Sequence, residues 1–242
     1  MTNTRKACVA DWDGTFRQGY TLIAWLEFLE RGHIVYATGS IDFKFHLQRY
    51  REGELSYQGL LDESYRIYAK ALSGYSAIEM KELARAFVRE DLSSLFDETL
   101  DVFNTLHESD IAVFVVSGGP QLPLEAYQEI IPITGLYALD LRVDDDGRYT
   151  GEIATVFGGD REKSALMEEI GREYDIVFGF GDTPADYALL RVAKYPFFRG
   201  GDGWASKLTP DLQGRVQPLQ GLSRSSVQSL LHGSASIGPK PC

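Results

Sequence analysis

Cysteine is scarce in this sequence: Cys8 lies within an apolar run and Cys242 is the last residue. Two cysteines in these places cannot build a disulfide framework or a cysteine-based zinc site, so a disulfide-stabilised miniprotein is excluded and a reducing compartment is expected. The sequence also lacks a run of about 18 uninterrupted apolar residues, which a membrane span requires. The first apolar run meets Asp11 too early to form the core of a signal peptide, and we expect a cytoplasmic protein.

Positive charge is also in short supply. The 24 lysines and arginines face 35 aspartates and glutamates, which gives a formal net charge of −11. Such a surface repels the phosphates of nucleic acids and anionic lipids, so we expect no nucleic acid and no membrane as the main partner. A small anionic substrate therefore requires a pocket that is locally positive. No pattern in the sequence indicates an oligomeric state.

The 242 residues suffice for one large domain, or for one domain with an insertion. Three short apolar runs end abruptly in small or acidic residues, at residues 7–10, 111–116 and 176–178. Runs of this kind, separated by helical patterns, predict strands of a parallel sheet that is covered on both faces. Ligands bind where the carboxyl ends of such strands meet the loops, so the polar residues after these runs are expected at one edge.

Helical periodicity fills the stretches between these runs, at residues 21–31, 57–72, 76–90, 94–107 and 160–173. The stretch between the first and second runs is far longer than a crossover helix needs. We therefore predict an α/β protein with a Rossmann-like parallel sheet and helices on both faces, plus a small helical cap domain. The predicted limits are 1–16 and 94–232 for the core, 17–93 for the cap and 233–242 for a flexible tail. A hairpin is predicted from residues 136–143 and 149–153.

The first apolar run leads directly into Asp11-Trp-Asp13-Gly-Thr. Two carboxylates two residues apart at a strand end point to the same side, and Gly14 allows a tight turn after them. An acidic surface turn would produce the same motif, so its meaning depends on what the other strand ends carry.

Polar clusters also follow the other two runs. Ser117 and Gly118 offer a hydroxyl and bare backbone N–H groups, the kind of turn that cradles a phosphate. Lys163 lies in the first turn of a predicted helix, where a cation opposes the helix dipole. An exposed lysine that serves solubility is the more common explanation for such a position. Asp182 and Asp186 follow the third run, where helix capping is an alternative explanation. Capping does not explain the ordered set of D-x-D-G-T, S-G-G, lysine and G-D-x-x-x-D.

This ordered set resembles the haloacid dehalogenase (HAD) superfamily, and specifically its phosphatases with a small helical cap after the first motif, such as the phosphoserine phosphatase-like branch. The resemblance covers roughly residues 6–198. It implies a HAD-like core in which Asp11 is the nucleophile and Asp13 is the general acid/base.

The resemblance also implies the residues that bind phosphate and metal. Phosphate would be bound by Ser117, Gly118 and Lys163, and Mg²⁺ by Asp11, Asp13 and Asp182, with support from Asp186. Four carboxylates in one pocket repel a phosphate dianion, since each like-charge pair about 4 Å apart costs on the order of 4 kcal/mol at an effective dielectric constant of about 20. A divalent cation is therefore needed, and Mg²⁺ prefers oxygen ligands of this kind. Asp13 must also be protonated to act as an acid, so its pKa is expected above the ordinary value of about 3.9.

The predicted cap departs from that of phosphoserine phosphatases. Where those enzymes hold the serine with a glutamate and an arginine, this sequence has Tyr20 and Ser64, which argues against phosphoserine as the substrate. Tyr20, Phe43 and Phe45 are candidates for recognising the leaving group. Other aromatic residues of the cap lie mostly at helical spacing and are expected in its core, namely Tyr57, Tyr65, Tyr68, Tyr75 and Phe87. One or two of these that lie near the open edge are further candidates for recognising the leaving group.

We therefore expect a Mg²⁺-dependent phosphomonoesterase, a hydrolase that acts on a small phosphorylated metabolite through an aspartyl-phosphate intermediate. A phosphotransferase or phosphomutase would share the intermediate and pass the phosphoryl group to an alcohol instead of water. A catalytically silent HAD-like binding protein is the non-enzymatic alternative, and Asp13 argues against it because a binder needs no proton donor there. A carbon–halogen hydrolase is disfavoured, since such relatives generally lack the second aspartate.

Overall fold

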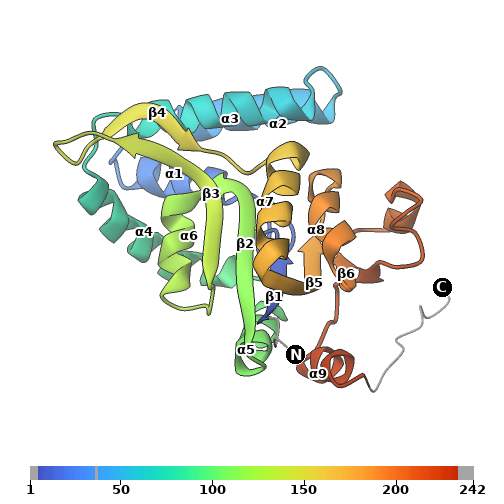
Figure 1. Ribbon diagram of the computed structural model, residues 1–242. Coiled ribbons are helices and arrows are strands. Elements are labelled where there is room, and N and C mark those ends of the chain that lie inside the picture. The colour runs from blue at the N-terminus through green and yellow to red at the C-terminus, as the bar shows by residue number, and fades with distance from the viewer. Residues whose placement is uncertain (1–4, 36–37, 234–242) are drawn as a thin grey trace.

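The structure is a computed structural model that describes residues 5–35 and 38–233 (Figure 1). Its centre is a seven-stranded sheet in the order β4-β3-β2-β1-β5-β6-β7, parallel except for the antiparallel pair of β3 and β4. The strands are β1 (Arg5–Ala10), β2 (Ile111–Pro120), β3 (Gly135–Val143), β4 (Tyr149–Thr155), β5 (Tyr174–Gly181), β6 (Tyr195–Phe198) and β7 (Gln217–Pro218). The predicted α/β class is confirmed. The predicted tail lies outside the described residues from residue 234 on, and so does Cys242.

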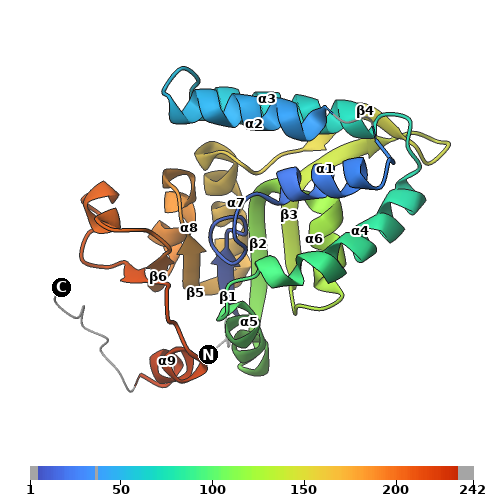
Figure 2. The same cartoon turned by 180° about the vertical axis from the view of Figure 1, so that it is seen from behind.

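Helices cover both faces of this sheet and one of its ends (Figures 1 and 2). The α-helices are α1 (Thr21–Arg31), α2 (Gly39–Arg51), α3 (Tyr57–Leu72), α4 (Ala77–Asp91), α5 (Thr99–Glu108), α6 (Gln121–Gln128), α7 (Asp160–Glu173), α8 (Tyr187–Val192) and α9 (Arg224–Leu231). No helix in the described ranges combines the length and the apolar character needed to cross a membrane.

Strand β1 lies between β2 and β5, and its side chains enter two different layers. Cys8 and Ala10 belong to a large hydrophobic cluster that includes residues of α5. Ala7 and Val9 belong to a second cluster, which includes residues of α7 and α8. All four side chains are fully buried. Burial on both faces explains why this strand is a continuous apolar run rather than an alternating pattern.

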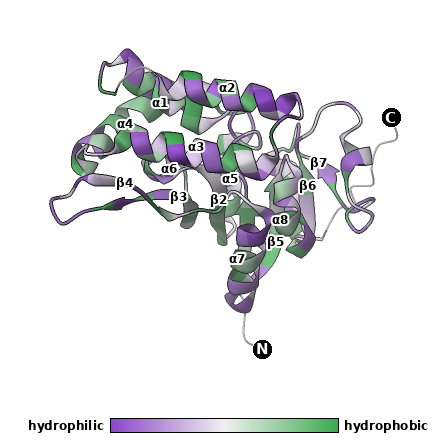
Figure 3. Ribbon diagram, turned by 90° about the horizontal axis from the view of Figure 1, so that it is seen from above, coloured by the Kyte–Doolittle hydropathy of each residue, from purple (hydrophilic) through white to green (hydrophobic). Residues whose placement is uncertain are grey.

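Helices α2 and α3 pack against each other across the end of the sheet at which β1, β2 and β5 stop (Figure 1). Seen from above, α2 and α3 run side by side, and both ribbons carry hydrophilic as well as hydrophobic residues (Figure 3). Helix α4 packs instead on α6, at the side of the sheet. The hydroxyl of Ser56 accepts a hydrogen bond from the N–H of Gly59 at the start of α3, as expected for a serine that caps a helix.

The segment between α3 and α4 is tied to the β3–β4 hairpin by backbone hydrogen bonds. The N–H of Gly74 donates to the carbonyl of Tyr149 at 2.7 Å, and the N–H of Tyr149 donates to the carbonyl of Tyr75 at 3.0 Å. The N–H of Ala77 donates to the carbonyl of Gly147 at 2.9 Å. These bonds attach the segment of α1 to α4 to the β3–β4 hairpin. The attachment is separate from the covalent connection of this segment to β1.

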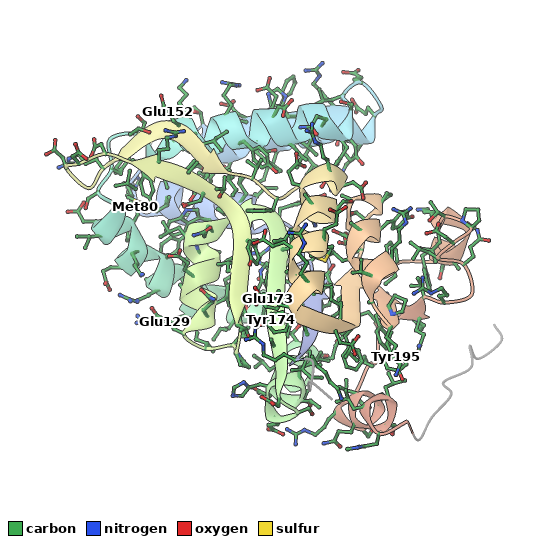
Figure 4. All side chains as sticks on the ribbon, viewed as in Figure 1. Met80, Glu129, Glu152, Glu173, Tyr174 and Tyr195 are labelled. Atoms are coloured by element: carbon green, nitrogen blue, oxygen red, sulfur yellow. The ribbon has the colours of Figure 1, made fainter. Side chains whose placement is uncertain are left out.

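At the opposite end of the sheet, the contacts involve the side chain of Arg5 at the start of β1. The guanidinium of Arg5 lies 4.4 Å from the centre of the Tyr174 ring and pairs with Glu173 at 2.9 Å. Figure 4 shows Glu173 and Tyr174 at the junction of α7 and β5, away from α2 and α3. The end of the sheet that faces α2 and α3 is therefore the end where the polar clusters follow the strands.

The helix predicted over residues 94–107 begins only at Thr99. The preceding residues bond instead to the loop after β1: the N–H of Gln18 donates to the carbonyl of Ser94, and the N–H of Phe96 donates to the carbonyl of Phe16. These contacts between distant segments satisfy the backbone groups that a helix would otherwise use.

Three helices, α2, α6 and α9, are absent from the prediction. The large side chains that α2 buries are Phe43 and Leu47, which is too few to produce a clear helical pattern. Helices α6 and α9 have only eight residues each, and α6 carries Pro123 in its first turn. The sequence also predicts one short helix over residues 184–192, and there the structure has a 3₁₀ turn followed by α8.

A buried ion pair joins the two ends of the segment that contains α1 to α4. Arg17 follows β1, and its guanidinium donates to both carboxylate oxygens of Asp91, at 2.7 and 2.6 Å. The hydroxyl of Tyr127 donates to the same carboxylate at 2.6 Å. The side chains of Arg17 and Asp91 are only 3% and 6% exposed, so the pair is shielded from water.

We expect the Asp91→Ala substitution to lower the free energy of unfolding by about 3–5 kcal/mol, because it leaves the buried charge of Arg17 without a partner. Glu90→Ala is the matched control, since the neighbouring carboxylate pairs with Arg31 on the surface and is 63% exposed. The control should change the unfolding free energy by about 1 kcal/mol or less. Urea unfolding of the two variants tests this, and equal destabilisation would contradict a special role for the buried pair.

Candidate functional site

A cavity of about 380 Å³ lies between α2 and α3 and the carboxyl ends of β1, β2 and β5. The side chains that line its floor come from four separate segments of the chain. The floor includes every residue that the sequence analysis proposed for catalysis, phosphate binding or metal binding, namely Asp11, Asp13, Ser117, Gly118, Lys163, Asp182 and Asp186. Their positions follow from the sheet order, because β1 lies between β2 and β5 and the three strands are parallel.

Lys163 lies at the centre of this floor and is buried, with a side chain that is 2% exposed. Its ammonium group donates to Asp11 Oδ1 at 2.9 Å and to Asp186 Oδ1 at 2.5 Å. The common explanation for a lysine in the first turn of a helix, an exposed side chain, is therefore wrong here. Burial by itself lowers the pKa of Lys163, but the attraction of Asp11 and Asp186 outweighs it and the net shift is upward.

Asp186 has both of its carboxylate oxygens engaged. Oδ1 accepts from Lys163, and Oδ2 accepts from the N–H and the hydroxyl of Thr183 at 2.8 and 2.7 Å. Oδ2 also accepts from the N–H of Asp182 at 3.2 Å. Asp186 therefore fixes the position of Lys163 and the shape of the loop after β5. Helix capping, the alternative explanation for this motif, is also present in the Thr183–Asp186 pair.

Asp182 reaches the carboxylate of Asp11 across the turn at Gly14. A Cβ atom placed on Gly14 would lie 2.1 Å from Asp182 Oδ2, and Gly14 has a φ of +83°. Glycine is therefore required here both for space and for backbone conformation. The hydroxyl of Thr15 lies between the two carboxylates, 3.1 Å from Asp182 Oδ1 and 3.4 Å from Asp11 Oδ2.

Asp13 points toward the N-terminus of α1. Both of its carboxylate oxygens lie 2.9 Å from the N–H of Thr21, the first residue of this helix, and Oδ1 accepts from the Thr21 hydroxyl at 2.5 Å. Burial raises the pKa of Asp13 to about 6, although Arg17 and the bonds from Thr21 oppose the increase. The direction agrees with the expectation from the sequence, but burial and not the neighbouring carboxylates is the main cause.

The last residues of β2 bring backbone N–H groups to the cavity beside these carboxylates. The strand continues to Pro120, so Ser117 and Gly118 lie within it, whereas the sequence predicts a turn after the strand at these residues. The hydroxyl of Ser117 is buried and accepts from the N–H of Gly119 at 3.0 Å. A Cβ atom on Gly119 would lie 3.1 Å from Asp13 Oδ2, and one on Gly118 would lie 3.1 Å from the Cα of Gly158. The two glycines thus allow this end of β2 to lie close to both the carboxylates and the loop before α7.

The floor of the cavity carries more negative than positive charge. Burial raises the pKa of Asp11 to about 7, with Asp186 adding to the increase and Lys163 opposing it. Burial also raises the pKa of Asp182 to about 9, and both Asp11 and Asp186 add to this shift. One lysine is therefore not sufficient to keep these carboxylates ionised.

The same residues fit a bound cation. One carboxylate oxygen from each of Asp11, Asp182 and Asp186 lies within 4.8 Å of the others. Asp186 already bonds to Lys163 and Thr183, which leaves Asp11 and Asp182 as the carboxylates best placed to ligate a metal. An all-oxygen site with one or two carboxylates suits a hard divalent ion such as Mg²⁺.

The wall of the cavity opposite this floor comes from the segment between β1 and α4, and it corrects part of the prediction for the aromatic residues. Tyr57 lines the cavity and is 36% exposed, although its helical spacing predicted a place in the core. Tyr65 is buried in the core as predicted and also lines the cavity. Tyr68 and Phe87 are buried in the core as predicted. Tyr75 is partly buried and donates to the carbonyl of Ile34 at 2.6 Å. Of the three aromatic residues proposed for leaving-group recognition, Tyr20 and Phe43 line the cavity, whereas Phe45 does not and is 60% exposed.

The sequence analysis gave no role to three threonines that contact the predicted carboxylates, namely Thr15, Thr21 and Thr183. Thr15 belongs to the first motif and Thr183 to the last one, so both positions were visible in the sequence. Thr21 was not, because its contact with Asp13 depends on the direction in which α1 leaves the loop.

Comparisons with known proteins agree with this geometry. The sequence matches the family model of haloacid dehalogenase-like hydrolases over residues 8–191. No curated protein gives a significant match. The structure is similar to a protein with unknown function from Bordetella pertussis Tohama I, with a TM-score of 0.72 and 20% identity over 90% of this chain and 100% of that chain.

Two further similar structures belong to proteins whose names state an activity. One is a probable phosphoserine phosphatase from Vibrio cholerae, with a TM-score of 0.62 and 16% identity over 95% of this chain and 64% of that chain. The other is cytosolic 5′-nucleotidase IIIB bound to cytidine, with a TM-score of 0.66 and 14% identity over 95% of this chain and 86% of that chain. At these identities the likeness shows a shared fold. The family model covers most of the chain, and the chain therefore belongs to the haloacid dehalogenase-like hydrolases.

Proposed function

We propose that this hydrolase is a Mg²⁺-dependent phosphomonoesterase that acts on a small phosphorylated metabolite. The observation that carries the proposal is the position of Asp11. Its carboxylate accepts a hydrogen bond from Lys163 at the floor of a cavity that Asp182 and Ser117 also line. Proteins of the same fold include a probable phosphoserine phosphatase and a 5′-nucleotidase, which supports a phosphate monoester as substrate.

In this proposal, residues of the floor bind the phosphate group of the substrate. The ammonium of Lys163 and the Ser117 hydroxyl face phosphate oxygens, together with the backbone N–H groups around Gly118 at the end of β2. Asp11, Asp182 and the backbone of Asp13 would hold Mg²⁺, which would neutralise charge on the phosphate and on the carboxylates. Phosphate binding without such charge compensation is opposed by the surplus of carboxylates.

The proposed reaction has two steps, both carried by aspartates. A carboxylate oxygen of Asp11 attacks phosphorus, the bond from phosphorus to the ester oxygen breaks, and Asp13 gives its proton to the leaving alcohol. Asp13, now ionised, then takes a proton from a water molecule that attacks the aspartyl-phosphate, which releases inorganic phosphate and restores Asp11. The raised pKa of Asp13 fits its part as an acid, and its bonds to Thr21 hold the ionised form between the two steps.

We also propose that residues 17–93 act as a cap on a core of residues 1–16 and 94–232. Helices α2 and α3 from this segment cover the cavity, and its two ends meet in the Arg17–Asp91 ion pair. A cap in this position limits the access of water to the aspartyl-phosphate.

Magnesium binding is expected to depend on Gly14. In the wild type, Mg²⁺ at about 100 times its dissociation constant should raise the free energy of unfolding by about 2.7 kcal/mol. Gly14→Ala should remove most of this gain, because the added methyl group occupies the position of Asp182 Oδ2. Asp182→Asn should have the same effect through loss of charge. Thermal unfolding with and without Mg²⁺ measures both.

Gly53→Ala is the matched control for Gly14→Ala. Gly53 has a similar φ of +78°, but a Cβ atom there would meet no other atom within 4 Å. Both variants therefore carry backbone strain, and only the change at Gly14 affects the carboxylates. Retention of the full Mg²⁺ effect in Gly14→Ala would contradict the proposed metal site.

Replacement of the proposed nucleophile should abolish turnover. We expect Asp11→Asn to lower kcat for p-nitrophenyl phosphate with Mg²⁺ by about 10³-fold or more, because the amide cannot form the aspartyl-phosphate. Asp175→Asn is the control: this exposed aspartate lies near the start of β5, at the opposite end of the sheet. Wild-type turnover in Asp11→Asn would show that the assignment of the nucleophile is wrong.

The same assay separates hydrolysis from phosphoryl transfer when a competing alcohol such as glycerol is added. A hydrolase releases one inorganic phosphate for each p-nitrophenol, whereas a phosphotransferase releases less phosphate than p-nitrophenol. Mg²⁺ binding without turnover of any ester in a broad panel would identify a binding protein instead.

A further inference from the structure

The wall of the cavity differs in chemistry from its floor. The charged side chains that line the cavity all belong to the floor, at the strand ends and α7. Among the described lining residues that belong to residues 17–93, none carries a charged side chain. This wall is instead rich in aromatic rings, contributed by Tyr20, Phe43, Tyr50, Tyr57 and Tyr65.

Four of these rings form two pairs. The rings of Tyr20 and Phe43 are 5.9 Å apart with an angle of 53° between their planes, and the rings of Tyr50 and Tyr57 are 5.9 Å apart at 58°. Tyr20, Tyr50 and Tyr57 retain 40%, 36% and 36% of their surface exposed, although large aromatic side chains are usually more buried. Exposed rings that line one cavity offer faces and edges for a further ring.

The hydrogen-bonding groups of this wall are neutral and few. The hydroxyl of Ser64 donates to the carbonyl of Leu60 at 2.5 Å. The hydroxyl of Tyr57 lies 3.4 Å from the carbonyl of Gly158. The hydroxyl of Tyr65 has no hydrogen-bond partner in the described part of the chain, and the residue is only 5% exposed. A buried hydroxyl without a partner is costly, so Tyr65 is available to bond with a polar atom of a bound molecule.

Such a wall is a poor environment for a charged leaving group. An ammonium or carboxylate group placed against this wall would lose its hydrating water without gaining an opposite charge, so a substrate that carries such a group would bind more weakly. The cations Lys44 and Arg51 do not line the cavity; they line a neighbouring depression, together with Glu27, that shares Gly19 and Tyr20 with it. The serine part of phosphoserine carries both an ammonium and a carboxylate, and the wall offers a partner for neither.

We infer that the substrate is a phosphate monoester of an uncharged alcohol that bears an aromatic ring, with the ring held between the Tyr20–Phe43 and Tyr50–Tyr57 pairs. This inference rests on the proposed phosphomonoesterase function and specifies its leaving group. Two sources share this chemistry: a simple arylalkyl phosphate and a nucleoside 5′-phosphate. In both, the phosphate binds to the residues of the floor and the ring packs against the aromatic side chains of the wall.

Substrates with alcohols of similar acidity test the inference, because they differ in the group that meets the wall. The assay compares kcat/KM for benzyl phosphate, nucleoside 5′-monophosphates, n-propyl phosphate and O-phosphoserine, all with Mg²⁺. The preferred ring-bearing ester should exceed n-propyl phosphate by about tenfold or more, and O-phosphoserine should fall below n-propyl phosphate. A higher value for a nucleoside 5′-monophosphate than for benzyl phosphate identifies a nucleobase as the ring, and the reverse identifies a simple aryl group.

The outcomes separate this inference from the proposed function. Hydrolysis of p-nitrophenyl phosphate and of all the esters without preference for a ring, or with O-phosphoserine as the best substrate, overturns the inference and leaves the phosphomonoesterase in place. Absence of hydrolysis of every ester, p-nitrophenyl phosphate included, overturns both.

Variants of two aromatic residues on α2 locate the effect in the cavity. Tyr50→Leu should lower the ratio of kcat/KM for the preferred ring-bearing ester to that for n-propyl phosphate by about 3- to 10-fold, because one ring contact is lost. Phe45→Leu is the matched control, since Phe45 lies on the same helix, is 60% exposed and does not line the cavity. An unchanged ratio in Tyr50→Leu, or an equal decrease in Phe45→Leu, would place ring recognition outside this wall and overturn the inference.

Discussion

The buried ammonium of Lys163 is the contact on which the site depends. It bonds to Asp11 after β1 and to Asp186 after β5, and it comes from α7, the helix that precedes β5. A buried cation without partners is strongly destabilising, so these segments must meet for the chain to reach its folded state. The interaction that closes the fold around the end of β1 therefore also positions the carboxylate proposed as the nucleophile. Structure and proposed chemistry depend on the same bonds.

The floor of the cavity holds more acidic groups than its lysine can balance. Asp11, Asp13, Asp182 and Asp186 line the cavity beside Lys163, the one cation among its described lining residues. Burial is the first cause of the raised pKa values of Asp11 and Asp182. A divalent cation would remove the surplus and would also give a phosphate dianion a favourable place in an acidic protein. Gly14 makes the close approach of the two carboxylates feasible, since any side chain at this position would displace Asp182. An excess of negative charge over the whole chain is thus compatible with an anionic substrate.

The charged and the aromatic residues of the cavity come from different parts of the chain. Its floor is built by strand ends and carries the charged groups, while its aromatic wall comes from α1 to α3 and the loop before them and is neutral. Hydrogen bonds from the segment after α3 to the β3–β4 hairpin, and the Arg17–Asp91 ion pair, fix this wall relative to the sheet. In the proposed function, a change in the wall therefore alters the preferred leaving group while the groups proposed to act on phosphorus stay in place.

Several features could be predicted from the sequence, namely the α/β class, the central strands, most of the long helices and the set of polar residues that meet at one edge of the sheet. These follow from short-range periodicity and from the rule that parallel strands share their carboxyl edge. Three further features depend on how distant segments pack: the burial of Lys163, the contact of Thr21 with Asp13, and the place of Tyr57 at the cavity. Helical spacing shows which side chains share a face, but the surface that this face meets is set by packing between segments far apart in the chain.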